Sequence, residues 1–192
     1  SVLVCNYKTG HILCMVSSPS FDPDIGFDDA NPWYDSVYVN RCLGAAYTPG
    51  SVFKLVTLAA AIENIDDLYD RTFTCDGSTE VDGSIIHCTG THGEQTIEQA
   101  LANSCNCAFG TLALELGADT LGEYADKLGL TSQQKLDNIT TAAGNFTRDN
   151  SKSASLAWSG IGQYEDLVSP YSMLRLVSAI ANNGNLNEPS LL

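Results

Sequence analysis

One segment constrains the fold more than any other part of the chain. Residues 51–64 read SVFKLVTLAAAIEN, a run of good helix formers that is apolar on nearly all sides. Such a helix must be buried, because an exposed helix keeps a polar face. We therefore expect a helix over residues 51–62, directly after Pro49 and Gly50, at the centre of a packed domain.

The composition is that of a globular protein. The 192 residues suffice for one domain with a core, or for part of a larger one. Hydrophobic residues make up 44% and charged residues 17%, which excludes intrinsic disorder. Nine Lys and Arg against 23 Asp and Glu give a net charge of −14, which argues against nucleic acid and anionic lipid as partners. No apolar run approaches the ~18 residues of a membrane span, and no signal peptide opens the chain.

The other segments indicate a mixed α and β fold. Two apolar runs around Lys8-Thr9-Gly10 predict a β-hairpin over residues 1–17. Residues 20–50 are rich in Pro, Asp, Gly and Asn and predict a long functional loop. Residues 71–95 have the composition of loops with short strands.

Helices dominate the middle of the chain. A capping box at residues 96–99 opens a helix to about Ala102. After an interruption at residues 103–106, helical spacing resumes until Gly117, and another short helix is expected from about residue 119 to 127.

A late helix is expected near the end of the chain. Ser169 should be its N-cap, Pro170 its first residue, and Gly184 should lie just past its end. The chain shows no internal repeat and no low-complexity tract.

Ser51 and Lys54 are polar exceptions in the apolar helix. They are three residues apart, so they share one face and their side chains can touch. Ser51 lies at the helix start, where free N–H groups and the positive end of the dipole stabilise an anion. Burial lowers the pKa of a Lys, and a neutral amine beside a hydroxyl can accept its proton. The pair therefore has the parts of an acyl-transfer nucleophile.

A structural interpretation of this pair stays open at this point. Ser at a helix start is usually a cap, and Lys in a first turn can reach water. The pattern Ser-x-x-Lys also occurs from Ser132 to Lys135. That copy lies in a polar stretch with no apolar helix behind it, and we discard it.

Ser104-Cys105-Asn106 forms a second candidate group, between two helical runs. Its polar side chains either satisfy loop backbone, which is the commoner role, or take part in a reaction. Ser104 could relay a proton to a leaving group, and Asn106 could hold a substrate amide or the Lys54 amine. We do not expect Cys105 to be the nucleophile, because no His lies nearby to activate it.

Seven Cys are present. Cys75 and Cys88 lie in a polar, Gly-rich segment, and a disulfide between them could contribute ~3 kcal/mol by chain entropy. Metal binding is the alternative, because His87 and His92 flank Cys88. The spacings match no zinc template, so we predict no metal and no cofactor. The other five Cys have apolar neighbours and are expected in the core.

Together these segments resemble the transpeptidase domain of class B penicillin-binding proteins, in the serine acyl-enzyme superfamily that includes the β-lactamases. TGHILCMVSSPSFDP resembles the opening hairpin, and NRCLGAAYTPGSVFKLVTLAAAIE the nucleophile helix. CTGTHGEQTIEQALANSCNCAF resembles the second motif, and GIGQYEDLVSPYSMLRLVSAIANNG a turn and late helix. The resemblance covers nearly the whole chain, in the right order.

This resemblance implies an α+β penicillin-binding protein/β-lactamase-like fold, with residues 1–192 supplying the helical subdomain and N-terminal hairpin of a partial transpeptidase domain. It makes Ser51 the acylated nucleophile, Lys54 its base, and Ser104 and Asn106 the second motif. The backbone N–H of Ser51 would form half of an oxyanion hole. The implied enzyme is a D,D-transpeptidase of peptidoglycan stem peptides ending in D-Ala-D-Ala, acylated also by β-lactam antibiotics.

The sequence departs from the family pattern in three places. Cys105 occupies the middle of the second motif, and Tyr164 stands where many relatives have Gly. The third motif, Lys-Thr-Gly, is expected past Leu192, so the C-terminal strands would be missing and one hairpin edge unpaired or covered by another chain. We interpret Lys8-Thr9-Gly10 as unrelated to that motif, and expect the chain alone to be inactive or weakly active.

Two other functions of the superfamily stay open: a serine β-lactamase and a β-lactam-sensing receptor domain. A β-lactamase must activate water on the acyl-enzyme, and we find no Glu placed for that role. The resemblance also implies a location on the extracytoplasmic face of the bacterial membrane, with an N-terminal anchor outside this sequence. Other proteins of cell-wall synthesis are expected as partners.

Overall fold

The computed structural model describes residues 1–24, 36–149 and 151–191. The chain divides into two compact units, each assembled from segments that are separate in the sequence. The first unit is Ser1–Tyr47, Gly129–Gly144 and Val168–Leu192, and the second is Thr48–Leu128 and Asn145–Leu167. Helices and strands occur in both units, which confirms the α+β class. Part of the long loop expected over residues 20–50, residues 25–35, lies outside the described residues.

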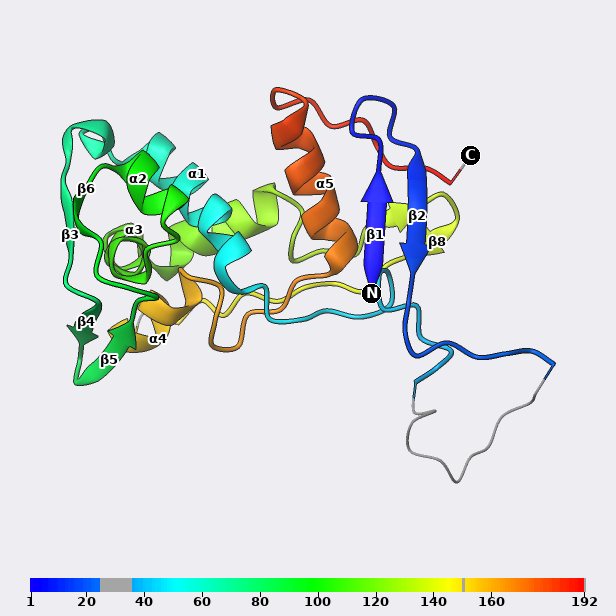
Figure 1. Ribbon diagram of the computed structural model, residues 1–192, viewed down its shortest axis with the longest axis horizontal. Coiled ribbons are helices and arrows are strands. Elements are labelled where there is room, and N and C mark those ends of the chain that lie inside the picture. Colours follow the sequence, from blue (N-terminus) through cyan, green and yellow to red (C-terminus); the bar gives the residue numbers. More distant parts are fainter. Residues whose placement is uncertain (25–35, 150, 192) are drawn as a thin grey trace. The chain divides into compact units, whose positions relative to one another are not determined.

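A β-hairpin and one helix build the first unit (Figure 1). The antiparallel strands β1 (Val2–Cys5) and β2 (Ile12–Val16) confirm the expected hairpin, and α5 (Pro170–Ala181) packs against β1. A second, short hairpin consists of β7 (Lys135–Leu136) and β8 (Ile139–Thr140). The small core comprises Cys42, Leu43, Leu136 and Tyr171, with Leu3, Ile12 and Met15 packed against them.

The C-terminal segment covers the start of the hairpin edge. The Ile12 N–H donates to the Ser190 carbonyl (2.9 Å), and the Ser190 N–H donates to the Gly10 carbonyl (3.0 Å). Gly10 has φ +83°, and a Cβ on it would collide with the Glu188 carbonyl oxygen, so this close approach requires glycine. The expected unpaired edge is therefore partly occupied by the chain itself.

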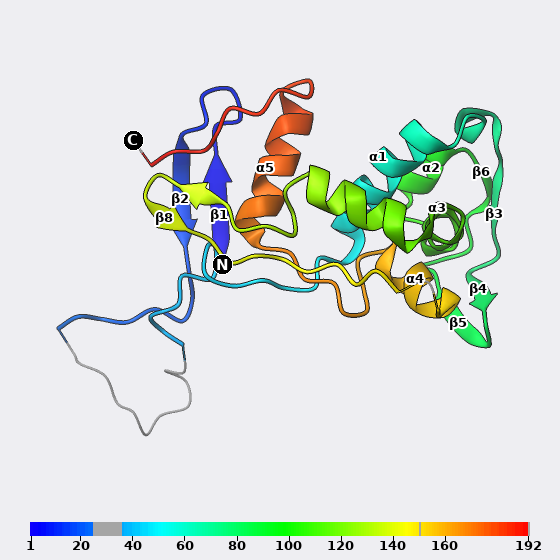
Figure 2. The ribbon, with the colours of Figure 1, turned by 180° about the vertical axis from the view of Figure 1, so that it is seen from behind.

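Two helices form the centre of the second unit. α1 (Lys54–Asn64) packs along α3 (Asn106–Lys127), and α4 (Ser153–Ser159) lies against α3 in both views (Figures 1 and 2). The helix expected from residue 51 begins at Gly50 as one turn of 3-10 helix, η2 (Gly50–Phe53), and then continues as α1. It is mostly buried, as expected, although Ile62 near its end is 47% exposed.

Short antiparallel pairs lie beside these helices, as expected for residues 71–95. β3 (Phe73–Cys75) pairs with β6 (Gly93–Gln95), and β4 (Ser78–Val81) pairs with β5 (Ser84–His87). A short 3-10 helix, η3 (Leu68–Asp70), comes before them. Their apolar residues join one core with α1, α3 and α4, which includes Phe73, Cys75, Ile86, Ile97, Phe109, Leu112 and Ala157.

The middle helices agree with those expected from the sequence. α2 (Ile97–Ala102) opens with the predicted capping box between Thr96 and Gln99. α3 contains the two helices expected before and after Gly117, which meet at a kink where Gly117 takes a non-helical conformation (φ 80°, ψ 160°). Among the described residues, no helix has the length and apolar character that a membrane crossing needs.

The predicted cap of the late helix is only partly right. Ser169 occupies the N-cap position of α5, and Pro170 follows at the first turn. The Ser169 side chain makes no capping hydrogen bond, and its hydroxyl is buried without a partner among the described residues. Tertiary packing covers the hydroxyl that a free helix end would use as its cap.

A buried carboxyl, Asp166, lies near the end of the second unit. Its side chain is 0% exposed, and its Oδ2 has no hydrogen-bond partner among the described residues. Burial raises the pKa of Asp166 to about 7, although hydrogen bonds from Ser159 and the Thr147 N–H act in the opposite direction. The folded protein therefore holds a proton that the unfolded chain releases at lower pH.

This burial predicts a loss of stability with rising pH. The contribution of Asp166 is fully present below its ordinary pKa of 3.8 and is lost as the pH rises through about 7. Because one pKa unit is worth about 1.4 kcal/mol, the free energy of unfolding should fall by up to about 4 kcal/mol between pH 4 and 8 from this group. Asp166→Asn should remove that dependence.

Urea unfolding of the protein and the variant at both pH values measures the difference. Glu165→Gln is the control: the Glu165 charge makes only the smallest contribution to the raised pKa of Asp166, so most of the pH dependence should remain. Parallel pH profiles for the protein and Asp166→Asn would contradict the assignment.

Candidate active site

The turn that carries Ser51 presents a hydroxyl to solvent directly beside a buried amine. Ser51 lies in η2 and is exposed, whereas Lys54, the first residue of α1, is 1% exposed. The Lys54 Nζ lies 3.2 Å from the Ser51 Oγ. The one-turn spacing that the sequence analysis singled out therefore brings these two side chains into hydrogen-bonding distance.

A loop after α4 holds this turn in place. The Gly50 N–H donates to the Gly162 carbonyl (2.7 Å), and the Thr57 hydroxyl donates to the Gly160 carbonyl (2.6 Å). Gly162 has φ +73°, and a Cβ there would overlap the Gly50 carbonyl oxygen. Only glycine allows the loop to approach the nucleophile turn this closely.

An elbow between α2 and α3 supplies the other polar groups. The Cys105 N–H donates to the Ala100 carbonyl and the Ser104 N–H to the Leu101 carbonyl, both at 2.9 Å. These are the two bonds of a Schellman motif, which needs a left-handed residue after the helix end. Ser104 takes that position with φ 51°, where glycine is usual. Such strain in a non-glycine residue costs on the order of 1–3 kcal/mol and is typical of functional sites.

The elbow directs three oxygens at the Lys54 amine. Its Nζ lies 2.6 Å from the Ser104 carbonyl oxygen, 2.9 Å from the Ser104 hydroxyl and 2.7 Å from the Asn106 Oδ1. The Asn106 Nδ2 donates to the His87 carbonyl (2.8 Å), which fixes the direction of the amide. With Ser51, the structure thus brings together all four residues that the sequence analysis proposed as the site.

This set of partners suits a neutral amine. Two of the four oxygens, the Ser104 carbonyl and Asn106 Oδ1, can only accept hydrogen bonds, so they take the two N–H groups. Either the Ser51 or the Ser104 hydroxyl can then donate to the single lone pair of the nitrogen. Burial lowers the pKa of Lys54, while the Cys88 and Cys105 thiols act in the opposite direction. The arrangement can therefore transfer the Ser51 proton to Lys54.

The discarded second Ser-x-x-Lys has none of these features. The Ser132 hydroxyl accepts a hydrogen bond from the Gln134 Nε2 (2.8 Å), and Lys135 begins β7 with an exposed side chain. Lys8 lies in the turn between β1 and β2, where its carbonyl accepts a hydrogen bond from Asn187 (2.8 Å).

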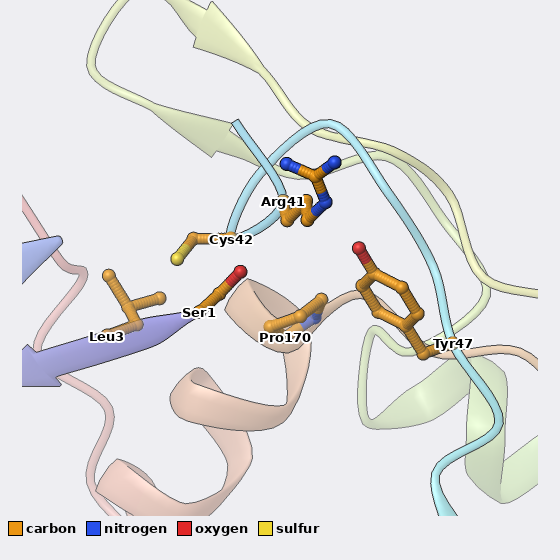
Figure 3. Close-up of a pocket in the computed structure, with 6 residues that line it drawn as sticks. All are labelled: Ser1, Leu3, Arg41, Cys42, Tyr47 and Pro170. Carbon is orange, nitrogen blue, oxygen red and sulfur yellow. The ribbon is translucent and has the colours of Figure 1, made fainter. Parts of the chain in front are cut away.

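The first unit also has a cavity of about 340 Å³ next to the first turn of α5 (Figure 3), lined by Ser1, Leu3, Arg41, Cys42, Tyr47 and Pro170.

All seven Cys are free thiols. The predicted Cys75–Cys88 disulfide is therefore not formed in this structure, although the two sulfurs lie within 4.8 Å of each other. Cys42, Cys105 and Cys107 are buried as expected, whereas Cys5 and Cys14 are half-buried. Burial raises the pKa of Cys105 to about 11. Burial also acts to raise the pKa of Cys88, but N–H donors at the start of α3 lower it to about 6.

Sequence reasoning did not identify two parts of this site. The sequence placed Gly162 only in a turn that resembles the family. The positive φ of Gly162 and its close approach to the Gly50 carbonyl oxygen appear only in the structure. Sequence reasoning weighed His87 and His92 with Cys88 as a metal alternative, and did not connect Cys105 with them. The four-residue spacing from Cys88 to His92 was the feature of the sequence that could have indicated this cluster.

The family model of the penicillin binding protein transpeptidase domain matches residues 1–192. Stage V sporulation protein D of Bacillus subtilis is 36% identical over 96% of this chain, which spans 28% of that protein. Peptidoglycan D,D-transpeptidase PbpA of Mycolicibacterium smegmatis is 30% identical over 100% of this chain, which spans 42% of it.

A solved structure has the same fold. The penicillin G acyl-enzyme complex of penicillin-binding protein A from M. tuberculosis superposes with a TM-score of 0.83 at 28% identity. The match covers 98% of this chain and 47% of that one. The chain thus corresponds to less than half the length of each of these relatives.

The contact between Gly162 and Gly50 predicts that Gly162→Ala destabilises the second unit. The matched control is Gly83→Ala, since Gly83 has a similar φ of +77° but nothing within 4 Å of a new Cβ. The control should cost ~1–2 kcal/mol for the left-handed conformation alone. Gly162→Ala should cost ~1–3 kcal/mol more, because the loop must move away from the nucleophile turn.

Free energies of unfolding from urea titrations measure both costs. Equal costs for the two variants would show that Gly162 does not support the turn.

Proposed function

Because the chain belongs to the penicillin-binding protein transpeptidase domain family, we propose that the protein is a peptidoglycan D,D-transpeptidase with Ser51 as its nucleophile. The observation that carries this proposal is the buried Lys54 amine, 3.2 Å from the Ser51 hydroxyl and held by oxygens of Ser104 and Asn106. The proposed substrate is a stem peptide that ends in D-Ala-D-Ala.

In the first half-reaction, the Ser51 Oγ attacks the carbonyl carbon between the two D-Ala residues while Lys54 accepts the hydroxyl proton. The oxyanion forms at the start of η2, where backbone N–H groups stabilise negative charge. Ser104, 2.9 Å from the Lys54 Nζ, can pass that proton to the departing amine of the terminal D-Ala. A Ser51 ester and free D-Ala result.

The second half-reaction reverses the proton path. An amine of a neighbouring stem peptide attacks the Ser51 ester and forms the new peptide bond. Its proton returns through Ser104 and Lys54 to the Ser51 oxygen, which restores the free enzyme. Asn106 positions Lys54, and its amide can hold the backbone of the substrate.

A β-lactam would acylate Ser51 by the same first step. Its ring amide opens, and the amine stays attached to the acyl group, so it does not leave as D-Ala does. A serine β-lactamase would need a further group to activate water. Among the residues that the structure describes, no carboxylate contacts Ser51, Lys54 or Ser104, which favours the transpeptidase.

The proposal extends to the setting of the protein. The substrate lies outside the cytoplasm, so we place the protein on the extracytoplasmic face of the membrane, with an anchor in a segment outside this sequence. We also propose that other proteins of cell-wall synthesis bind it.

In the complete domain, with the Lys-Thr-Gly segment expected past Leu192, the nucleophile assignment predicts that Ser51→Ala abolishes covalent labelling by a fluorescent penicillin, because no oxygen remains to form the ester. Ser132→Ala, the matched change in the other Ser-x-x-Lys, should label normally. Nitrocefin should give a burst of about one equivalent and then stop, whereas continued hydrolysis would favour a β-lactamase. Labelling lost in Ser132→Ala and kept in Ser51→Ala would overturn the assignment.

In the same complete domain, the base assignment predicts a large kinetic effect of Lys54→Ala. Loss of a general base typically slows a reaction ~10²–10⁴-fold, so the acylation rate should fall by that amount. Lys135→Ala is the control and should have no effect. The measurement is a time course of penicillin labelling, with circular dichroism to verify folding. A slowing below about tenfold would count against Lys54 as the base.

A further inference from the structure

The fully buried carboxyl of Asp166 lies between two segments that support the nucleophile turn η2. The Ser159 hydroxyl at the end of α4 donates a hydrogen bond to it, and so does the Thr147 N–H, which lies 3.5 Å from its Oδ1. We propose that Asp166, in its protonated form, is a positioning residue of the acyl-transfer reaction and holds both segments against η2. This role rests on the proposed function of Ser51, which η2 carries.

The first connection from Asp166 to the turn runs through the loop after α4. Ser159 is the last residue of α4, and its carbonyl accepts a hydrogen bond from the Gly162 N–H (2.8 Å). The Gly162 carbonyl in turn accepts a hydrogen bond from the Gly50 N–H (2.7 Å), at the start of η2. The position of Ser159 therefore determines where the carbonyl that supports the nucleophile turn lies.

The second connection runs through the segment that carries Phe146. The N–H groups of Asn145 and Leu167 each donate to the other residue's carbonyl (2.8 and 3.0 Å), so this segment pairs with the residue that follows Asp166. The buried ring of Phe146 stacks on the Phe53 ring, with centroids 5.6 Å apart and planes inclined by 8°. Phe53 is the last residue of η2. The two connections thus reach both ends of the nucleophile turn.

The surroundings of Asp166 suit a neutral carboxyl better than a carboxylate. Its Oδ2 has no hydrogen-bond partner among the described residues. A buried charge without compensation is far more costly than a buried neutral oxygen without a partner. Burial accordingly raises the pKa of Asp166 to about 7, which places its ionisation in the neutral pH range.

The charged groups on the neighbouring elements do not offset a negative charge on Asp166. The Glu165 carboxylate raises the pKa further, in the same direction as burial. Arg148, on the Phe146 segment, forms an ion pair with Asp126. The buried amine at the start of α1 donates to the oxygens of its own site. In the part of the chain that the structure describes, a proton is therefore what keeps this carboxyl neutral.

Loss of that proton should loosen both connections. Water stabilises a carboxylate, so the ionised side chain favours conformations in which it leaves its buried position. This movement displaces Ser159 and the Phe146 segment, and with them the supports of η2. Because a misplacement of ~1 Å can cost ~10²-fold in rate, the attack by Ser51 should slow although no reacting group is lost.

The first test compares acylation in the complete domain and in its Asp166→Asn variant. Asn has nearly the same shape and does not ionise, so it mimics the protonated carboxyl. With a pKa of about 7, the protonated fraction of Asp166 falls about 30-fold between pH 6 and 8.5. The ratio of variant to wild-type acylation rate should therefore rise by about 3- to 30-fold over this range. Titration of Lys54 affects both proteins alike and cancels in the ratio.

Time courses of labelling by a fluorescent penicillin at the two pH values give these rates. Glu165→Gln is the matched control, since it removes an exposed carboxyl from the same loop, and its ratio to the wild type should stay nearly constant. A ratio for Asp166→Asn that is equally constant would overturn the positioning role and leave the proposed function intact. Labelling that survives Ser51→Ala at both pH values would refute the proposed function, and the positioning role with it.

The second test observes the turn in the wild-type protein and does not depend on the folding of a variant. In NMR titrations, the carboxyl carbon of Asp166 and the amide groups of Gly50 and Gly162 should share one midpoint of about pH 7. The amide of Gly184, which also has positive φ but lies in the first unit, should not follow that midpoint. A Gly50 amide that does not respond when Asp166 ionises, or an Asp166 carboxyl that ionises near the ordinary pKa of 3.8, would contradict the proposal.

Discussion

The burial of the Lys54 amine determines how the second unit is arranged. A basic group taken out of water is costly unless polar partners replace the solvent. Here the partners come from two places: Ser51, one helical turn away, and the elbow at Ser104 and Asn106, fifty residues later in the chain. The elbow must therefore meet the start of α1, and the packing of α1 along α3 follows from that contact.

Several residues with positive φ lie around the same contact. Gly50 and Gly162 have positive φ where the loop after α4 touches the nucleophile turn, and Ser104 has positive φ without being glycine. Tyr164, where the family resemblance leads us to expect glycine, also takes φ 70°. Strain of this kind persists only where surrounding contacts enforce it. The Schellman bonds at the end of α2 and the core beneath α3 provide that enforcement.

A group of cysteines lies next to the same elbow. Sequence reasoning treated Cys105 as a core residue, and it is fully buried. Its sulfur also lies near two other thiols and His92, where the β3–β6 segment meets the start of α3.

Local patterns were sufficient to predict much of this protein. The apolar run at 51–64 predicts α1, the capping box at Thr96 predicts α2, and the spacing of Ser51 and Lys54 predicts their contact, because each depends on residues within one or two turns. The family resemblance added Ser104 and Asn106, which local sequence alone favoured as ordinary loop residues. In contrast, the unbonded hydroxyl of Ser169, the raised pKa of Asp166 and the meeting of Cys75 with Cys105 arise between segments far apart in the chain. Only the tertiary structure decides these features, because burial and long-range contacts are set by packing and not by neighbours in sequence.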